Sequence, residues 1–332
     1  MGAAGKGVVA ISNTGGLRAI FAALGANLGI TATKFAAFLI TGSASMLAES
    51  VHSLADSCNQ ALLLIGRHRA MRAQTEEHQF GYGRERYFYG FVVAVMLFTV
   101  GAVFSLYEGA HKITHPAEVH SPVVAFAVLG AAAVLEGFSL RTAVTESNLV
   151  RGRNGWRAFI TRTKSTDLPV VLLEDTAALL GLLFALAGVA LTVVTGDGVW
   201  DGAGSFSIGV LLAGAAMVVA RETKSLLIGE SAAAEVERRI VAALEAGPEV
   251  QRVIHLRTMH LSPESLLVAA KIAVRGGETA AQLVRGIDAA ESRVRAAVPI
   301  AEMIYLEPDL YRASRADQTD PAIRAVRRGR RD

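Results

Sequence analysis

Hydrophobic residues are concentrated in six long runs, each separated from the next by a shorter polar stretch. The runs cover Leu17–Thr41, Ser45–Gly66, Tyr87–Gly109, Pro122–Ala143, Leu168–Val194 and Phe206–Ala220. A helix needs about 20 mostly apolar residues to cross a bilayer. The pattern therefore predicts an α-helical membrane protein with six transmembrane helices over residues 17–228, after a cytosolic lead-in at 1–16.

Beyond Arg221 the pattern changes to that of a small soluble domain. Amphipathic helices are predicted at Ala233–Ala246 and Glu278–Val298, and strands at Val250–Leu261, Leu266–Val274 and Ala301–Leu306. This order predicts a cytosolic α+β domain at 229–309. Residues 310–332 form a polar, basic tail, for which disorder is expected.

Composition supports the membrane assignment and narrows the chemistry. Hydrophobic residues make up 52% of the chain and charged residues only 19%, whereas about a quarter of an ordinary soluble domain is charged. The basic residues form short clusters instead of one continuous patch, so nucleic acid is not an expected partner. A single cysteine, Cys58, excludes a CxxC metal site. Histidine and carboxylates are then the expected metal ligands.

Loop charge predicts the orientation. Basic residues follow the second run and precede the fifth: Arg67, Arg69, Arg72, Arg84, Arg86, Arg151, Arg153, Arg157, Arg162 and Lys164. The segments assigned to the outside, Gly42–Ala44 and Gly196–Gly204, contain no Lys or Arg. Cytoplasmic loops are enriched in Lys and Arg, so both termini are expected in the cytoplasm. The predicted location is the bacterial inner membrane, with multiple passes.

The second run carries the clearest candidate chemistry. Glu49, His52 and Asp56 are spaced by three and four residues, so they share one face of an otherwise apolar helix. Ionisable groups at this depth are costly and usually face the protein interior or a water-filled path. An imidazole and a carboxylate at this spacing suit a divalent metal. A structural hydrogen-bonded network between helices is the alternative.

The fifth run adds two adjacent carboxylates, Glu174 and Asp175, at a level that Asp56 can share. Adjacent residues point about 100° apart around a helix, so only one of the two can face the second run directly. His52, Asp56 and Asp175, with a water or a fourth carboxylate, would give a four-coordinate site. Metal and protons would compete for these groups, which is the physical basis of an exchanger.

Two further ionisable residues lie inside apolar runs. Glu136, in the fourth run, could relay protons or be a fourth ligand. Lys34, in the first run, could pair with Glu136 or extend its ammonium group towards the membrane surface, and both alternatives stay open.

The chain resembles the cation diffusion facilitator family. The resemblance rests on the phrases SMLAESVHSLAD in the second run, HQFGYGRER at residues 78–86 and SLYEGAHKITHP at residues 105–116. It implies a ferredoxin-like fold for the cytosolic domain, a homodimer, and metal/proton antiport through an intramembrane site. By resemblance, His52 and Asp56 occupy the ligand positions of the second span, and Asp175 occupies that of the fifth.

One departure from the family pattern concerns the site. A histidine usually stands four residues before the aspartate of the fifth span, and here that position is Val171. The phrase LLEDTAALLG is similar to that of a branch that includes some animal zinc transporters, in which Glu174 would compensate. The site then has a larger share of oxygen ligands than a site with two histidines, which favours manganese or iron as the substrate more than such a site would.

The predicted function is efflux of a divalent transition metal from the cytoplasm in exchange for protons. Zinc is the first candidate, because it favours a mixed set of histidine and carboxylate ligands. Manganese, iron, cobalt and cadmium are alternatives. No enzymatic activity and no cofactor are expected. A membrane-embedded metalloenzyme and a non-transporting metal-sensing scaffold are the rival functions, and the first is weakened by the absence of an HExxH motif.

Overall fold

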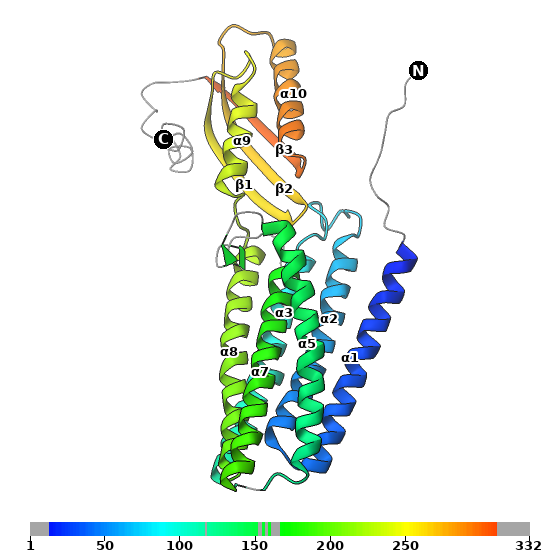
Figure 1. Ribbon diagram of the computed structural model, residues 1–332. Coiled ribbons are helices and arrows are strands. Elements are labelled where there is room, and N and C mark those ends of the chain that lie inside the picture. The colour runs from blue at the N-terminus through cyan, green and yellow to red at the C-terminus, as the bar shows by residue number, and fades with distance from the viewer. Residues whose placement is uncertain (1–12, 117, 152–154, 157–158, 161–166, 311–332) are drawn as a thin grey trace. The chain divides into compact units, whose positions relative to one another are not determined.

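The chain forms a group of long helices and a small C-terminal sheet domain (Figure 1). The computed structural model describes residues 13–116, 118–151, 155–156, 159–160 and 167–310. These residues divide into two compact units. The first contains most of the long helices, and the second contains the sheet together with residues 66–88. The predicted tail beyond Leu310 and most of the basic segment before the fifth run lie outside the described residues.

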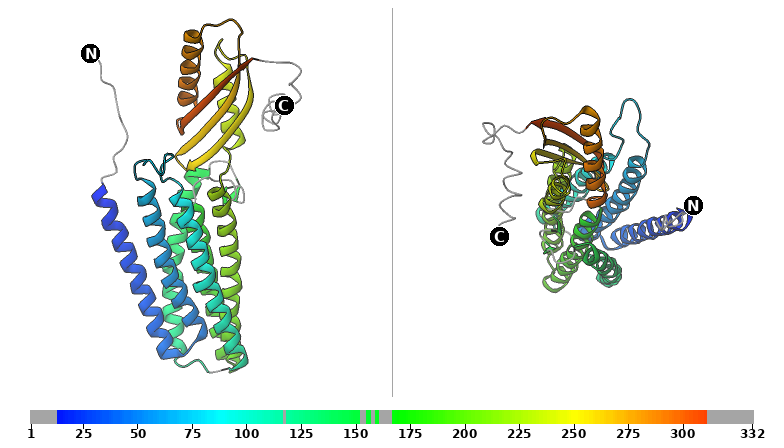
Figure 2. Two further views of the ribbon diagram at one scale, coloured as in Figure 1. Left: turned by 180° about the vertical axis from the view of Figure 1, so that it is seen from behind. Right: turned by 90° about the horizontal axis from the view of Figure 1, so that it is seen from above.

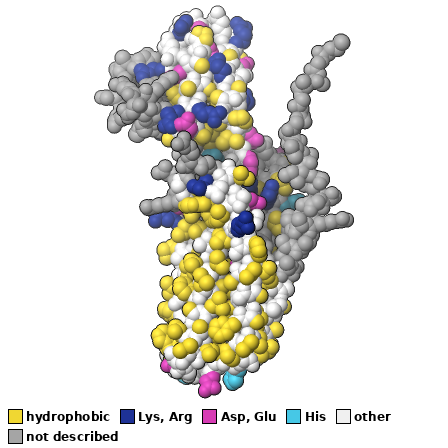
Figure 3. All heavy atoms as spheres, viewed as in Figure 1, with side chains coloured by type: hydrophobic (Ala, Val, Ile, Leu, Met, Phe, Trp, Pro, Cys, Tyr) yellow, Lys and Arg dark blue, Asp and Glu magenta, His cyan; other side chains and the backbone are white. Residues whose placement is uncertain are grey.

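Four helical stretches of the described chain are long and apolar enough to cross a membrane: Glu85–Thr114, Pro122–Leu149, Leu168–Thr195 and Val199–Ile228. The first stretch comprises three consecutive elements: α3 (Glu85–Met96), the π-helical segment η1 (Leu97–Val103) and α4 (Phe104–Thr114). The other three belong to α5 (Pro122–Arg151), α7 (Asp167–Thr195) and α8 (Val199–Ile228). Hydrophobic side chains cover the visible face of these helices (Figure 3). Such a surface suits contact with lipid.

The prediction of six spans is therefore confirmed at four positions. The other two positions hold α1 (Asn13–Thr41) and α2 (Ala44–Ala70), which are also long helices. Side chains of α1 are described only from Asn27 onward. In α2, the polar stripe that begins with Glu49 lowers the mean hydropathy below that of α1, α5, α7 and α8. Membrane spans at α1 and α2 remain predictions.

The prediction of a loop at Gly196–Gly204 is wrong from Val199 onward. Helix α8 begins at Val199, so Asp201 lies in its first turn and is fully buried. The Asp201 carboxylate accepts hydrogen bonds of 2.6 Å from Ser43 Oγ and from the Ala44 N–H, and Lys112 Nζ lies 3.9 Å away. Asp201 thus satisfies free N–H groups at the start of α2. The glycines that resemble a loop allow close packing: a Cβ on Gly202 would lie 2.9 Å from the Ile113 nitrogen.

Two helices cover one face of the three-stranded sheet in the C-terminal domain (Figures 1 and 2). The elements are α9 (Ala234–Glu245), β1 (Arg252–Ser262), β2 (Ser265–Val274), α10 (Ala280–Ala297) and β3 (Ala301–Leu310). β1 pairs antiparallel with β2, and β2 pairs parallel with β3. Ile240, Leu244, Val268 and Val294 belong to the shared core. All five predicted elements are present, with small differences at their ends.

The loop phrase at residues 78–86 packs against the turn between β1 and β2, within the second unit. Arg86 Nη1 lies 2.7 Å from a Glu264 carboxylate oxygen, and Arg84 Nη2 lies 2.9 Å from Met259 Sδ. A Cβ on Gly83 would lie 2.7 Å from the Leu261 carbonyl oxygen. The basic residues of this loop therefore attach it to the sheet domain, a contact that loop charge alone does not predict.

Removal of the Asp201 carboxylate should destabilise the protein strongly. Asp201→Ala removes the acceptor at the start of α2 and the anionic partner of Lys112, which keeps its hydrogen bond to the Gly42 carbonyl oxygen, so we expect a loss of ~2–4 kcal/mol in unfolding free energy. Chemical denaturation in detergent measures it. Asp197→Ala is the matched control, because Asp197 is exposed and caps only the Val199 N–H. Its loss should be about 1 kcal/mol or less, and equal losses would contradict the role of Asp201.

Candidate metal site

The polar stripe of α2 begins in the buried interior of the helices. His52 is 1% exposed, and its Nε2 lies 3.4 Å from Asp56 Oδ2 without hydrogen-bond geometry. The two residues are one turn apart on one face, as their spacing predicts. They form the first half of the candidate site.

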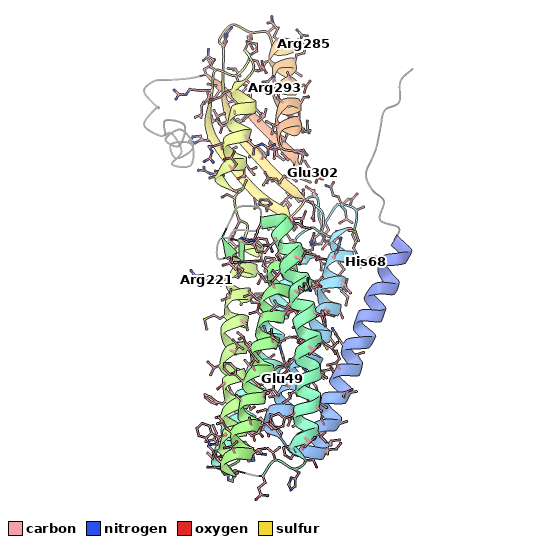
Figure 4. The ribbon with its side chains drawn as sticks, in the orientation of Figure 1. Glu49, His68, Arg221, Arg285, Arg293 and Glu302 are labelled. Carbon is pink, nitrogen blue, oxygen red and sulfur yellow. The ribbon has the colours of Figure 1, made fainter. Side chains whose placement is uncertain are left out.

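Glu49 belongs to the same stripe but has a different environment. Lys34 Nζ, from α1, lies 3.1 Å from Glu49 Oε2 and also donates a 2.7 Å hydrogen bond to Ser53 Oγ. Neither open alternative for Lys34 is seen, because its partner is Glu49 and not Glu136 or the membrane surface. Glu49 lies within the group of helices (Figure 4). It is held by an ion pair and is not part of the cavity wall.

A cavity of about 140 Å³ opens beside Asp56. Its walls come from α1, α2, α5 and α7: Asn27, Ile30, Ser53, Asp56, Gln60, Leu135, Glu136, Ser139, Val171, Glu174 and Asp175. Four of the predicted site residues thus meet around one space, namely Asp56, Glu136, Glu174 and Asp175. His52 is not a wall residue and reaches the cavity only through its contact with Asp56.

The two carboxylates of α7 point to different helices. Glu174 Oε1 accepts a 2.9 Å hydrogen bond from Asn59 Nδ2 of α2, and Asp175 Oδ2 accepts a 2.8 Å bond from Ser139 Oγ of α5. This divergence follows from the rotation of about 100° between adjacent helical residues. Asn59 and Ser139 were not singled out from the sequence. Asn59 follows Asp56 by three residues, and Ser139 follows Glu136 by three residues. This helical spacing is the signal in the sequence that could have identified them.

Several polar atoms at the site have no hydrogen-bond partner in the described part of the chain. They are both ring nitrogens of His52, Oδ1 of Asp56, Oε1 of Glu49 and Oδ1 of Asn59, all buried. A buried polar atom without a partner costs about 1–3 kcal/mol. A divalent cation would supply the missing partner for imidazole and carboxylate alike.

The donors do not form a closed coordination shell in this conformation. Among the described residues, no group of three or more His, Cys, Asp or Glu side chains converges closely enough to hold a metal ion. The reason is local, because Glu174 is bound to Asn59 and Asp175 to Ser139. Metal binding would require these side chains to exchange one partner for another.

Comparison with known proteins identifies the family. Residues 20–228 match the family model described as the cation efflux transmembrane domain. The protein belongs to the cation diffusion facilitator family. The resemblance drawn from the sequence motifs is thus confirmed, and the family is one of transporters.

Individual relatives of this cation diffusion facilitator share part of its length. The proton-coupled zinc antiporter SLC30A9, mitochondrial, of Homo sapiens is 34% identical over 67% of this chain and 39% of that protein. Metal tolerance protein C4 of Arabidopsis thaliana is 28% identical over 78% of this chain and 57% of that protein. The chain thus spans less than two thirds of either relative. A solved structure of MamM-CTD is 27% identical, covering 24% of this chain and 93% of that one at a TM-score of 0.23.

The two carboxylates of α7 should differ in their effect on metal affinity. Asp175→Asn removes a negative charge from the cavity wall, and we expect the affinity for zinc to fall by at least about a hundredfold. Glu174→Gln keeps a carbonyl acceptor for Asn59 and should weaken zinc binding less. Competition titration with a chromophoric chelator, on purified protein, measures both. Stronger loss in Glu174→Gln than in Asp175→Asn would make Glu174 the ligand.

Proposed function

We propose that this cation diffusion facilitator exports a divalent transition metal, with zinc as its first substrate, from the cytoplasm in exchange for protons. The observation that carries the proposal is the convergence of Asp56, Glu136, Glu174 and Asp175 on one cavity beside the unpartnered His52. The metal is cargo, so the site must bind it and release it. The names of the zinc antiporter and metal tolerance relatives agree with this assignment.

The charge of the cavity carboxylates explains the exchange of metal for protons. Four carboxylates around about 140 Å³ cannot all stay ionised without nearby positive charge, because like charges in a site of low dielectric constant repel strongly. Either a divalent cation or protons can supply that charge. Ligands must lose their protons before they bind metal, so arrival of the metal and departure of protons are coupled.

The ligand set favours zinc without excluding harder ions. Imidazole and carboxylate together suit Zn²⁺ at low coordination number. Val171 lines the cavity at the position where the usual family pattern has a histidine. The available donors are mostly oxygen, so Mn²⁺ and Fe²⁺ are the next candidates, followed by Co²⁺ and Cd²⁺.

The proposed setting is a bacterial inner membrane, with both termini in the cytoplasm and a homodimer as the working unit. The basic segments after α2 and before α7 support the orientation by the positive-inside rule. Six spans over 17–228 and a cytosolic ferredoxin-like domain over 229–309 complete the proposal.

Asp56→Ala should abolish metal transport without unfolding the protein. Purified protein in liposomes should accumulate zinc when a pH gradient is imposed, and a protonophore should stop the flux. The variant should transport at least about a hundredfold more slowly. Ser57→Ala is the control, since its hydroxyl bonds only to the Ser53 carbonyl oxygen of its own helix. Zinc flux that ignores the pH gradient, or normal flux in Asp56→Ala, would contradict the proposed function.

Val171→His should move selectivity towards zinc over manganese. The new imidazole would enter the cavity one turn from Asp175 and add a softer donor to an oxygen-rich site. Uptake of zinc in competition with manganese, compared between wild type and variant liposomes, tests this. Val171→Leu controls for bulk at the same position. An unchanged preference in Val171→His would show that position 171 does not reach the metal.

A further inference from the structure

Lys34 and Glu49 form an ion pair deep in the group of helices. Lys34 is 1% exposed and Glu49 is 0% exposed, and the Nζ–Oε2 distance is 3.1 Å. Lys34 Nζ is also 2.7 Å from Ser53 Oγ, and Ser53 is a wall residue of the cavity. The ammonium group therefore links Glu49 to a residue of the cavity wall.

The other side of Glu49 is closed by α7. A Cβ on Gly181 would lie 2.7 Å from Glu49 Oε1, so no larger residue fits there without displacement. The carboxylate is held between Lys34 on α1 and the backbone of α7. This packing leaves Oε1 buried without a hydrogen bond in the described chain.

Glu49 is chemically suited to be a metal ligand. It precedes His52 by three residues on the same face of α2. A fifth carboxylate at the site would add a full negative charge to the ligand set. Strong affinity then opposes release, and transport requires a site that binds well enough to load and weakly enough to unload.

We propose that Lys34 is a positioning residue that holds Glu49 out of the metal coordination shell. This inference rests on the proposed function. Lys34 cancels the charge of Glu49 and fixes its side chain away from the cavity, which limits the metal affinity of the site. An isolated buried carboxylate must instead find a proton or a cation, and a metal ion bound in the cavity would be such a cation.

Equilibrium zinc binding to the purified full chain tests the inference independently of transport. Lys34→Met removes the charge and keeps an unbranched side chain. At pH 8, where protons compete least, we expect its dissociation constant for zinc to fall by at least about tenfold, as one added charge near the site would produce at an effective dielectric constant of about 20. In liposomes the same variant should show a lower KM and a lower kcat.

The double variant Lys34→Met/Glu49→Gln is the matched control. It removes both charges, so it should fold and bind zinc within about threefold of wild type. It also decides the question if Lys34→Met alone does not fold. A folded double variant that fails to bind zinc would overturn the inference, since Glu49 would then be a ligand. Wild-type affinity in a folded Lys34→Met would overturn it as well. A flux that ignores the pH gradient would refute the exchange mechanism but leave this binding comparison intact.

Discussion

The cost of placing charged side chains among apolar helices is the constraint on which the rest of this structure depends. Each buried charge needs a partner, because its desolvation is not otherwise offset. Asp201 meets this requirement through the start of α2 and Lys112, and Glu49 does so through Lys34. Both carboxylates therefore have a cationic partner, although Oε1 of Glu49 accepts no hydrogen bond in the described chain. Among the described residues, Asp56 contacts only the His52 ring at ion-pair distance, and that difference marks the place where a cation can bind.

The paired groups also set the geometry of the unpaired ones. Asp201 of α8 forms hydrogen bonds with the start of α2, and Lys34 of α1 forms an ion pair with Glu49 of α2. His52 and Asp56 are carried by the same helix, so their position relative to α7 depends on both contacts. Glu174 and Asp175 are held at the cavity by single hydrogen bonds to Asn59 and Ser139. Single bonds of this kind are worth only about 1.5–3 kcal/mol to a charged group, which metal coordination can replace.

Sequence reasoning succeeded where the signal was local. Glu49, His52 and Asp56 stood out because charges are rare in apolar runs and the spacing places them on one face, and the C-terminal elements followed from their periodicity. Sequence reasoning failed where contacts between helices determine the partner of a side chain. The partner of Lys34 depends on the rotation of α1, and Asp201 looked like a loop residue because its glycine neighbours permit close helix packing. Whether Glu174 or Asp175 faces α2 also depended on helix rotation, which spacing along one chain cannot determine.

X-ray absorption spectroscopy of the zinc-loaded full chain reports the ligands of the bound ion, so it tests whether zinc binds at His52 and the carboxylates. We expect one imidazole nitrogen and otherwise oxygen donors at about 2.0–2.2 Å, with no sulfur. The imidazole signal should disappear in His52→Ala. Two or more imidazoles in the wild-type spectrum, or an unchanged spectrum in His52→Ala, would contradict a site built on His52, Asp56 and the carboxylates of α7.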